Sequence, residues 1–134
     1  MPASQVTDDP LVRTVATGLA AGRLVIGAGI WLAPGLAAKA LGFGSLDATA
    51  LALGRIAASR DLVLGAWQLS ALNDRQELRR ASLAVAVADG GDALTFALTA
   101  RGAGMRGAGM RGLAGAVPAT IAGAWLVRRL RSAL

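Results

Sequence analysis

The sequence predicts an all-α protein, a bundle of four transmembrane helices with both ends of the chain in the cytoplasm. Three observations lead to this prediction. The chain holds four long apolar segments without the alternation of period two that is typical of strands. It is 54% hydrophobic and only 16% charged, whereas soluble domains carry about 25% charged residues. Its 134 residues suit a single integral membrane domain.

Each apolar segment is long enough to cross a bilayer as a helix, at about 1.5 Å of rise per residue. The first segment is expected to end at Pro34, because proline disfavours helical backbone in the residue before it. Asp47 stands near the start of the second segment, where a negative charge favours a helix. The predicted spans are residues 11–33, 46–72, 77–100 and 112–130.

Two other interpretations of the apolar segments fit less well. A cleaved signal peptide has a basic leader, whereas the leader "MPASQVTDDP" is acidic and Arg23 interrupts the apolar run behind it. A soluble four-helix bundle needs a polar stripe along each helix, which the first and fourth segments lack. We therefore expect a multi-pass protein of the cytoplasmic membrane.

The positive charges between the spans predict the orientation. Four of them fall on one side of the membrane and seven on the other, and the side with more Lys and Arg is expected to face the cytoplasm. The net charge of +6 is spread among the ends of spans, which suits lipid head groups rather than nucleic acid. The four are Lys39, Arg101, Arg106 and Arg111; the seven are Arg13, Arg75, Arg79, Arg80, Arg128, Arg129 and Arg131.

A tandem repeat, "RGAGM RGAGM RG", joins the third and fourth segments between Arg101 and Gly112. A basic, glycine-rich loop can contact the phosphates of lipid head groups. It lacks the Lys-Ser/Thr ending of a nucleotide-binding loop, and no strand precedes it. We interpret the repeat as a flexible linker.

Charged residues also stand inside the apolar segments, where an unpaired charge costs at least about 2.5–3.5 kcal/mol. Five of the six lie about 16–21 Å from the cytoplasmic end by helix rise, and Arg55 lies about 27 Å away. We predict a polar network that joins the first three spans, with Arg23 paired to Asp89 or Asp92, and Arg60 paired to an aspartate of the third span. The six residues are Arg23, Arg55, Arg60, Asp61, Asp89 and Asp92.

Glycines at helical spacing mark predicted packing faces, because small residues let helices in a membrane approach closely. The pattern leaves open whether these faces meet within one chain or between subunits. The predicted packing residues are Gly18 and Gly22 in the first span, Gly54 and Gly65 in the second, and Gly115 and Gly123 in the fourth.

Residue types narrow the chemistry. The chain has no Cys and no His, and no spacing suggests a catalytic, cofactor or metal site, so we expect a protein that is not an enzyme. The first hypothesis is an accessory or scaffold subunit, or a homo-oligomer, in which the network fixes helix register. The second is a small transporter or channel that binds an ion or polar metabolite at the Arg/Asp layer. A membrane enzyme acting on lipid or quinone is a third.

Three stretches resemble one family: "GRLVIGAGIWLAP" at 22–34, "SRDLVLGAWQL" at 59–69 and "VADGGDAL" at 87–94. The family consists of small four-span bacterial membrane proteins, common in actinobacteria, with R-D-x-x-L-G and D-x-x-D motifs. The resemblance implies the four-span fold and no reaction. Its motif positions coincide with Arg23, Arg60, Asp61, Asp89 and Asp92, while the repeat and the acidic leader lie outside it.

Overall fold

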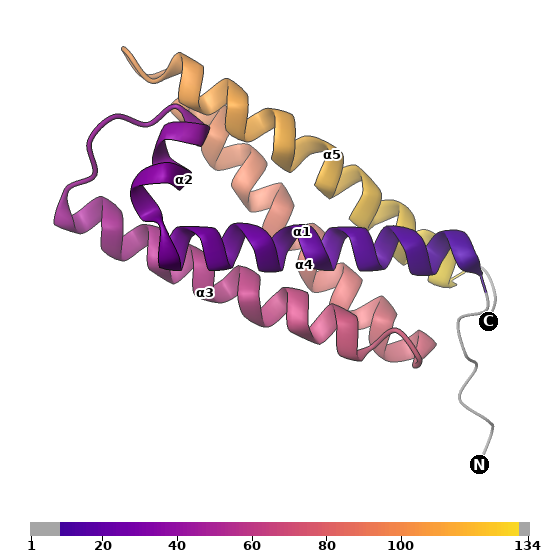
Figure 1. The fold of residues 1–134 in the computed structure, drawn as a ribbon. Helices are drawn as coiled ribbons and strands as arrows, with labels where there is room; N and C mark the ends of the chain where they lie inside the picture. The colour runs from indigo at the N-terminus through magenta and orange to yellow at the C-terminus, as the bar shows by residue number, and fades with distance from the viewer. Residues whose placement is uncertain (1–8, 132–134) are drawn as a thin grey trace.

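The computed structural model describes residues 9–131, so most of the acidic leader and the last three residues lie outside the described part of the chain. The described residues form five helices and no strand, which confirms the all-α prediction (Figure 1). The helices are α1 (Pro10–Leu32), α2 (Pro34–Leu41), α3 (Ala48–Ser70), α4 (Arg75–Thr99) and α5 (Arg106–Arg131).

Aspartates begin three of the long helices. An aspartate at this position accepts hydrogen bonds from the free N–H groups of the first turn. Its negative charge also interacts favourably with the positive end of the helix dipole. Asp9 accepts from the N–H groups of Leu11 and Val12. Asp47 accepts from the N–H of Ala50 at 2.7 Å, and Asp74 from that of Glu77 at 2.9 Å.

Helix α2 was not predicted from the sequence. Pro34 was expected to end a helix, and α1 does end just before it, but Pro34 also occupies the first turn of α2. Proline is favoured there because a first-turn N–H has no partner within the helix. Gly42 ends α2 in the left-handed conformation, with φ of 81°, which glycine adopts without strain.

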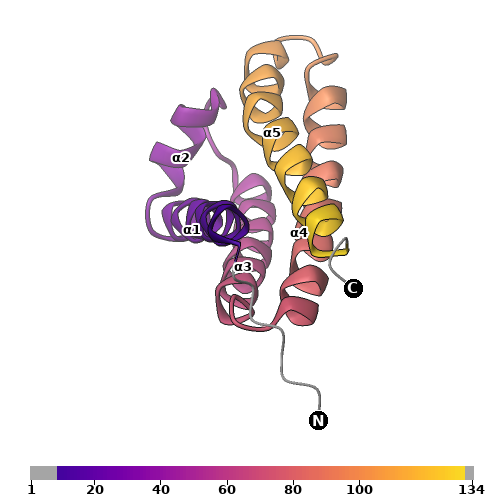
Figure 2. The same ribbon diagram turned by 90° about the vertical axis from the view of Figure 1, so that its right-hand side faces the viewer.

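The long helices form two pairs, α1 along α3 and α4 along α5 (Figures 1 and 2). The pairs meet at the end where α1 begins, α3 turns into α4 and α5 finishes. At the opposite end α2 extends from α1 towards the first turns of α5. The cluster of buried apolar side chains lies at the first of these ends and comprises Val12, Ala16, Ala71, Leu78, Ala81, Leu126 and Leu130.

Three helices, rather than the four predicted, are long and apolar enough to cross a membrane: α1, α4 and α5. Helix α3 has sufficient length, but any 18-residue stretch within it contains Arg55, Arg60 and Asp61. Its composition therefore does not support a four-helix transmembrane bundle. The architecture that composition does support is three candidate spans, with α3 and the short α2 packed among them.

Glycines bring α1 and α3 together, although not all of those predicted. A Cβ at Gly65 would lie 3.0 Å from the Leu24 side chain, and Gly27, which was not predicted, faces Ala58 and Leu62 equally closely. Gly54 makes only an ordinary contact. The pair at 18 and 22 makes no close contact within the chain, since a Cβ at either would meet nothing within 4 Å. The two glycines mark an exposed face of α1, and contact of this face with another subunit stays a prediction.

The second copy of the repeat is not a linker. Residues 106–110 form the first turns of α5, and Gly109 and Gly112 press against Ala100 and the Phe96 ring of α4. Further along, a Cβ at Gly123 would lie 3.0 Å from the Ala86 side chain, whereas Gly115 faces outward. Small residues at these points let α4 and α5 pack closely directly after a short turn.

Candidate functional site

Five of the six charges predicted to share a layer are brought together at the middle of the long helices. Arg23 comes from α1, Arg60 and Asp61 from α3, and Asp89 and Asp92 from α4. The close approach of α1 to α3 at Gly27 and Gly65 places Arg23 within reach of Asp61. We call these five residues the Arg/Asp network.

Arg23 is the centre of the network and bridges two helices. Only 7% of the residue is exposed. Its Nη1 donates to Asp61 Oδ1 at 2.7 Å. Its Nη2 donates to Asp89 Oδ1 and, at 3.4 Å, to the backbone carbonyl of Val85. One guanidinium thus connects α1, α3 and α4, and the predicted pairing of Arg23 with Asp89 is found.

Arg60 extends the network to Asp92 through a two-pronged ion pair. Nη1 donates to Oδ1 at 2.9 Å and Nη2 to Oδ2 at 2.7 Å, the geometry in which a guanidinium best matches a carboxylate. Nη2 also donates to Asp61 Oδ1 at 3.2 Å. Asp61 is therefore shared by both arginines, and the five side chains form one continuous chain of ion pairs.

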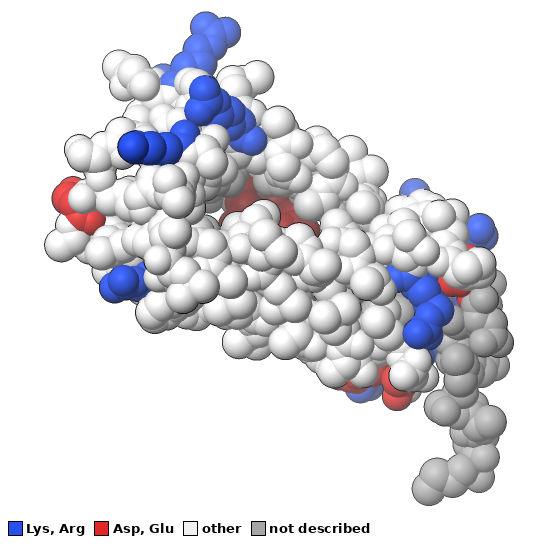
Figure 3. Space-filling view, in the orientation of Figure 1, with Lys and Arg blue, Asp and Glu red and all other residues white. Residues whose placement is uncertain are grey.

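Exposure increases from one end of the network to the other. The side chains of Arg23 and Asp89 are 8% and 9% exposed, whereas those of Arg60 and Asp92 are 37% and 32% exposed. Figure 3 shows acidic atoms on the floor of a hollow near the middle of the molecule, surrounded by uncharged surface. The network is accordingly buried at the Arg23 end and partly open at the other.

Arg55 does not belong to the network, so this part of the prediction was wrong. Its guanidinium lies over the Trp31 ring, 5.3 Å from the ring centre, and Trp31 Nε1 donates to the Ser59 hydroxyl at 3.2 Å. Five residues separate Arg55 from Arg60, which is about 7.5 Å of helix rise. Arg55 therefore reaches the end of α1 rather than the layer of aspartates.

Because Arg55 lies outside the network, the network has three carboxylates and two guanidiniums. The formal balance is one negative charge when all five are ionised. In addition, Asp89 Oδ2 is buried and has no hydrogen-bond partner. A buried carboxylate oxygen without a partner is costly in an apolar surrounding.

Sequence reasoning missed a second polar contact between α3 and α4. Gln68 Nε2 donates to the Ser82 hydroxyl at 3.3 Å, and both residues are completely buried. The signal was present, because both are uncharged polar residues within apolar runs. Such residues bind helices to each other within membranes.

Within residues 9–131, no group of three or more His, Cys, Asp or Glu side chains is arranged to hold a metal ion. Comparison of the chain with known protein families, with curated proteins and with solved structures finds no match. The family resemblance of its motifs therefore stays a prediction.

Proposed function

We propose that this chain is a non-enzymatic, four-span protein of the cytoplasmic membrane that serves as an accessory or scaffold subunit or as a homo-oligomer. The observation that carries the proposal is Arg23, which binds Asp61 of α3 and Asp89 of α4 at once. Buried ion pairs of this kind fix helix register and the choice of partner. In this proposal the network holds the two helix pairs in one arrangement for assembly.

The packing of α3 supports a fourth span in spite of its charges. It lies antiparallel along α1 (Figure 1), so a bilayer crossed by α1 also encloses α3. Its outward side chains Leu53, Ile56 and Val63 are 62–67% exposed and apolar. Its Arg60 and Asp61 are paired on the inner side, which lowers the cost of placing them at mid-depth.

The distribution of charge supports a lipid environment and not a nucleic-acid partner. Figure 3 shows Lys and Arg at the two ends of the molecule, and the broad surface between them is uncharged apart from the acidic atoms in the hollow. Large apolar side chains are exposed on all five helices, as expected of a surface that faces lipid. An even number of spans places both chain ends on one side, and the excess of Arg there favours the cytoplasm.

Outward-facing glycines support assembly with another chain. Gly18 and Gly22 on α1 and Gly115 on α5 have open space where a side chain would be. Small residues on a surface that faces lipid let a second helix approach closely. The same feature serves a homo-oligomer and an accessory subunit.

Mass measurement of the protein purified in mild detergent tests this proposal. We expect a defined oligomer or a co-purified membrane partner, and we expect Gly22→Leu to disrupt it. Gly107→Leu is the matched control, because Gly107 also has nothing within 4 Å but lies in the first turn of α5. A wild-type monomer that purifies without a partner would contradict the proposal.

A second candidate function is transport of a small cation, most simply a proton. It is favoured by the uncompensated negative charge of the network and by the unpartnered Asp89 Oδ2. The groups around Asp89 are Arg23 from α1, Arg60 and Asp61 from α3, and Asp92 one turn along α4. The charged residues of α5, which packs on α4, stand towards its two ends.

Flux through proteoliposomes separates the two candidates. A transporter should dissipate an imposed pH gradient, followed with a trapped pH-sensitive dye, and Asp89→Asn should abolish the flux while the protein stays folded. Arg131→Gln, at the far end of α5, should leave the flux unchanged. Equal rates for wild type and empty liposomes would exclude proton transport and leave the scaffold proposal standing.

A further inference from the structure

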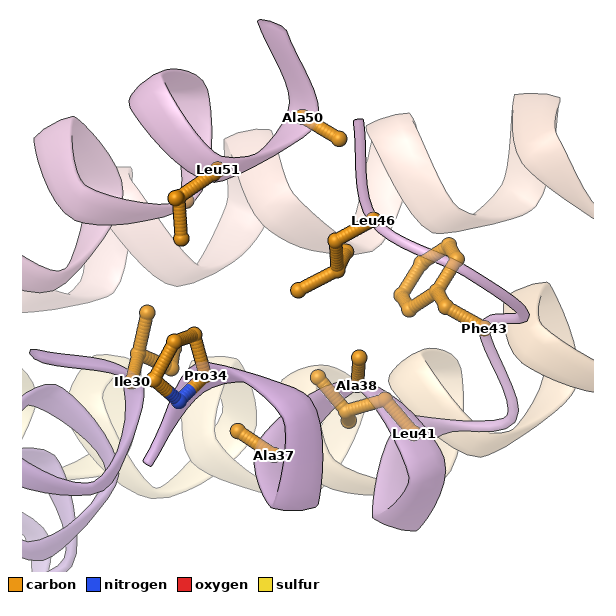
Figure 4. Close-up of a pocket in the computed structure, with 10 residues that line it drawn as sticks. Ile30, Pro34, Ala37, Ala38, Leu41, Phe43, Leu46, Ala50 and Leu51 are labelled. Atoms are coloured by element: carbon orange, nitrogen blue, oxygen red, sulfur yellow. The ribbon is translucent and has the colours of Figure 1, made fainter. Parts of the chain in front are cut away.

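An apolar cavity of about 230 Å³ lies at the end of the molecule opposite to the apolar core. It is lined by the end of α1, by α2, by the loop after α2 and by the start of α3. Figure 4 shows the side chains of Ala38 and Leu41 on one side of it and that of Leu46 on the other, with Phe43 beside Leu46. All the residues that line the cavity are apolar, so it offers no side-chain partner to a polar ligand.

Positive charges stand beside this cavity. A Cβ at Gly42 would lie 2.9 Å from Nη1 of Arg111, and Gly42 connects Leu41 to Phe43, which both line the cavity. Lys39 lies in the last turn of α2. Figure 3 shows Lys and Arg side chains gathered over α2 and the start of α5.

These cations lack partners within the described part of the chain. Neither the Lys39 nor the Arg111 side chain forms a hydrogen bond or ion pair there. Asp47, the carboxylate at this end, faces the first turn of α3 and accepts from the N–H of Ala50. An apolar cavity and uncompensated positive charge therefore occur side by side.

We propose that this cavity binds one acyl chain of an anionic phospholipid, whose phosphate lies against Arg111 and Lys39. The chemistry on both sides is complementary, because an arginine fork suits phosphate oxygens and an apolar cavity suits a hydrocarbon chain. The volume is below the about 300–1,000 Å³ of pockets for drug-sized ligands, so the cavity holds a segment of the acyl chain while the rest of the chain lies along the apolar surface. A helix from a second copy, about 10 Å wide, is too large to enter it.

Native mass spectrometry of the full chain in mild detergent tests the proposal, with dioleoyl phosphatidylglycerol and dioleoyl phosphatidylcholine as probes. Wild type should retain one phosphatidylglycerol in preference to phosphatidylcholine. Arg111→Gln and Lys39→Gln should each weaken that binding about fivefold, as expected for one cation near a lipid surface. Arg131→Gln, an exposed arginine at the other end, should leave it unchanged.

Ala50→Phe distinguishes the contribution of the acyl chain from that of the lipid head group, because it fills the cavity and leaves both cations in place. It should weaken phosphatidylglycerol binding, while glycerol phosphate alone should not bind detectably to wild type. The proposal is overturned if the two lipids bind equally, if Arg131→Gln weakens binding as much as Arg111→Gln, or if Ala50→Phe has no effect. Displacement of the lipid by a second copy of the chain would also overturn it.

Discussion

Arg60 of α3 and Asp92 of α4 are joined by two parallel hydrogen bonds, at 2.9 and 2.7 Å. This ion pair lies between the α1–α3 and α4–α5 helix pairs. The backbones of α3 and α4 approach each other only loosely. The neighbouring Arg23 bridges the same helices through Asp61 and Asp89. Side-chain ion pairs, rather than close helix packing, therefore join α3 to α4 at mid-length.

Asp89→Asn should be tolerated, because an amide oxygen still accepts from Arg23 and the change leaves two carboxylates for two guanidiniums. We expect the free energy of unfolding to fall by no more than about 1.5 kcal/mol. Circular dichroism during denaturation in mixed detergent measures it. Asp89→Leu, which offers Arg23 no acceptor, should cost clearly more. Equal losses for the two variants would show that Asp89 makes no useful contact with Arg23.

Gly112→Ala should destabilise the chain, whereas Gly115→Ala should not. A Cβ at Gly112 would enter the Phe96 ring, and overpacking of this kind costs about 1–3 kcal/mol. Gly115 faces open space, so alanine there should be neutral or stabilise the helix by up to about 1 kcal/mol. Each variant adds one methyl group, and the two positions are three residues apart on α5. The same thermal midpoint for both would be incompatible with the described α4–α5 contact.

Single cysteines test whether α3 crosses the membrane, since the chain has no Cys of its own. Ser45→Cys lies before α3 and Gln76→Cys lies after it, and both positions are exposed. If α3 crosses, a membrane-impermeant maleimide should label intact cells at only one of them, expected to be Ser45→Cys. Both should react after the membrane is permeabilised. Labelling of both positions in intact cells would place the ends of α3 on one side.

The mid-depth ion pairs were predictable from sequence, because helix rise alone sets the depth of Arg23, Arg60 and the aspartates. The same reasoning placed Arg55 nearer the far end but could not foresee its stacking on Trp31. Glycine spacing predicted Gly65 and Gly123 correctly. It did not distinguish them from Gly18 and Gly22, which contact no other helix of the chain, because spacing identifies a face of small residues and not what that face meets.

The features missed by sequence analysis depend on the local position of single residues. Pro34 ends one helix and begins another, and nothing in its type distinguishes the two roles. The composition of the repeat is that of a linker, but its second copy forms the first turns of α5, and Gly109 and Gly112 face α4. In the second case, packing against α4 is what composition does not show.

Two arginines in similar apolar runs provide the most direct test of the account. Arg23 is held by two aspartates, while Arg55 lies on Trp31. Arg23→Gln leaves three carboxylates with one guanidinium, so it should reduce the free energy of unfolding by about 3–5 kcal/mol. Arg55→Gln should lose only about 0.5–1 kcal/mol. Equal losses, measured side by side in the same detergent, would contradict the claim that the Arg/Asp network holds the helices together.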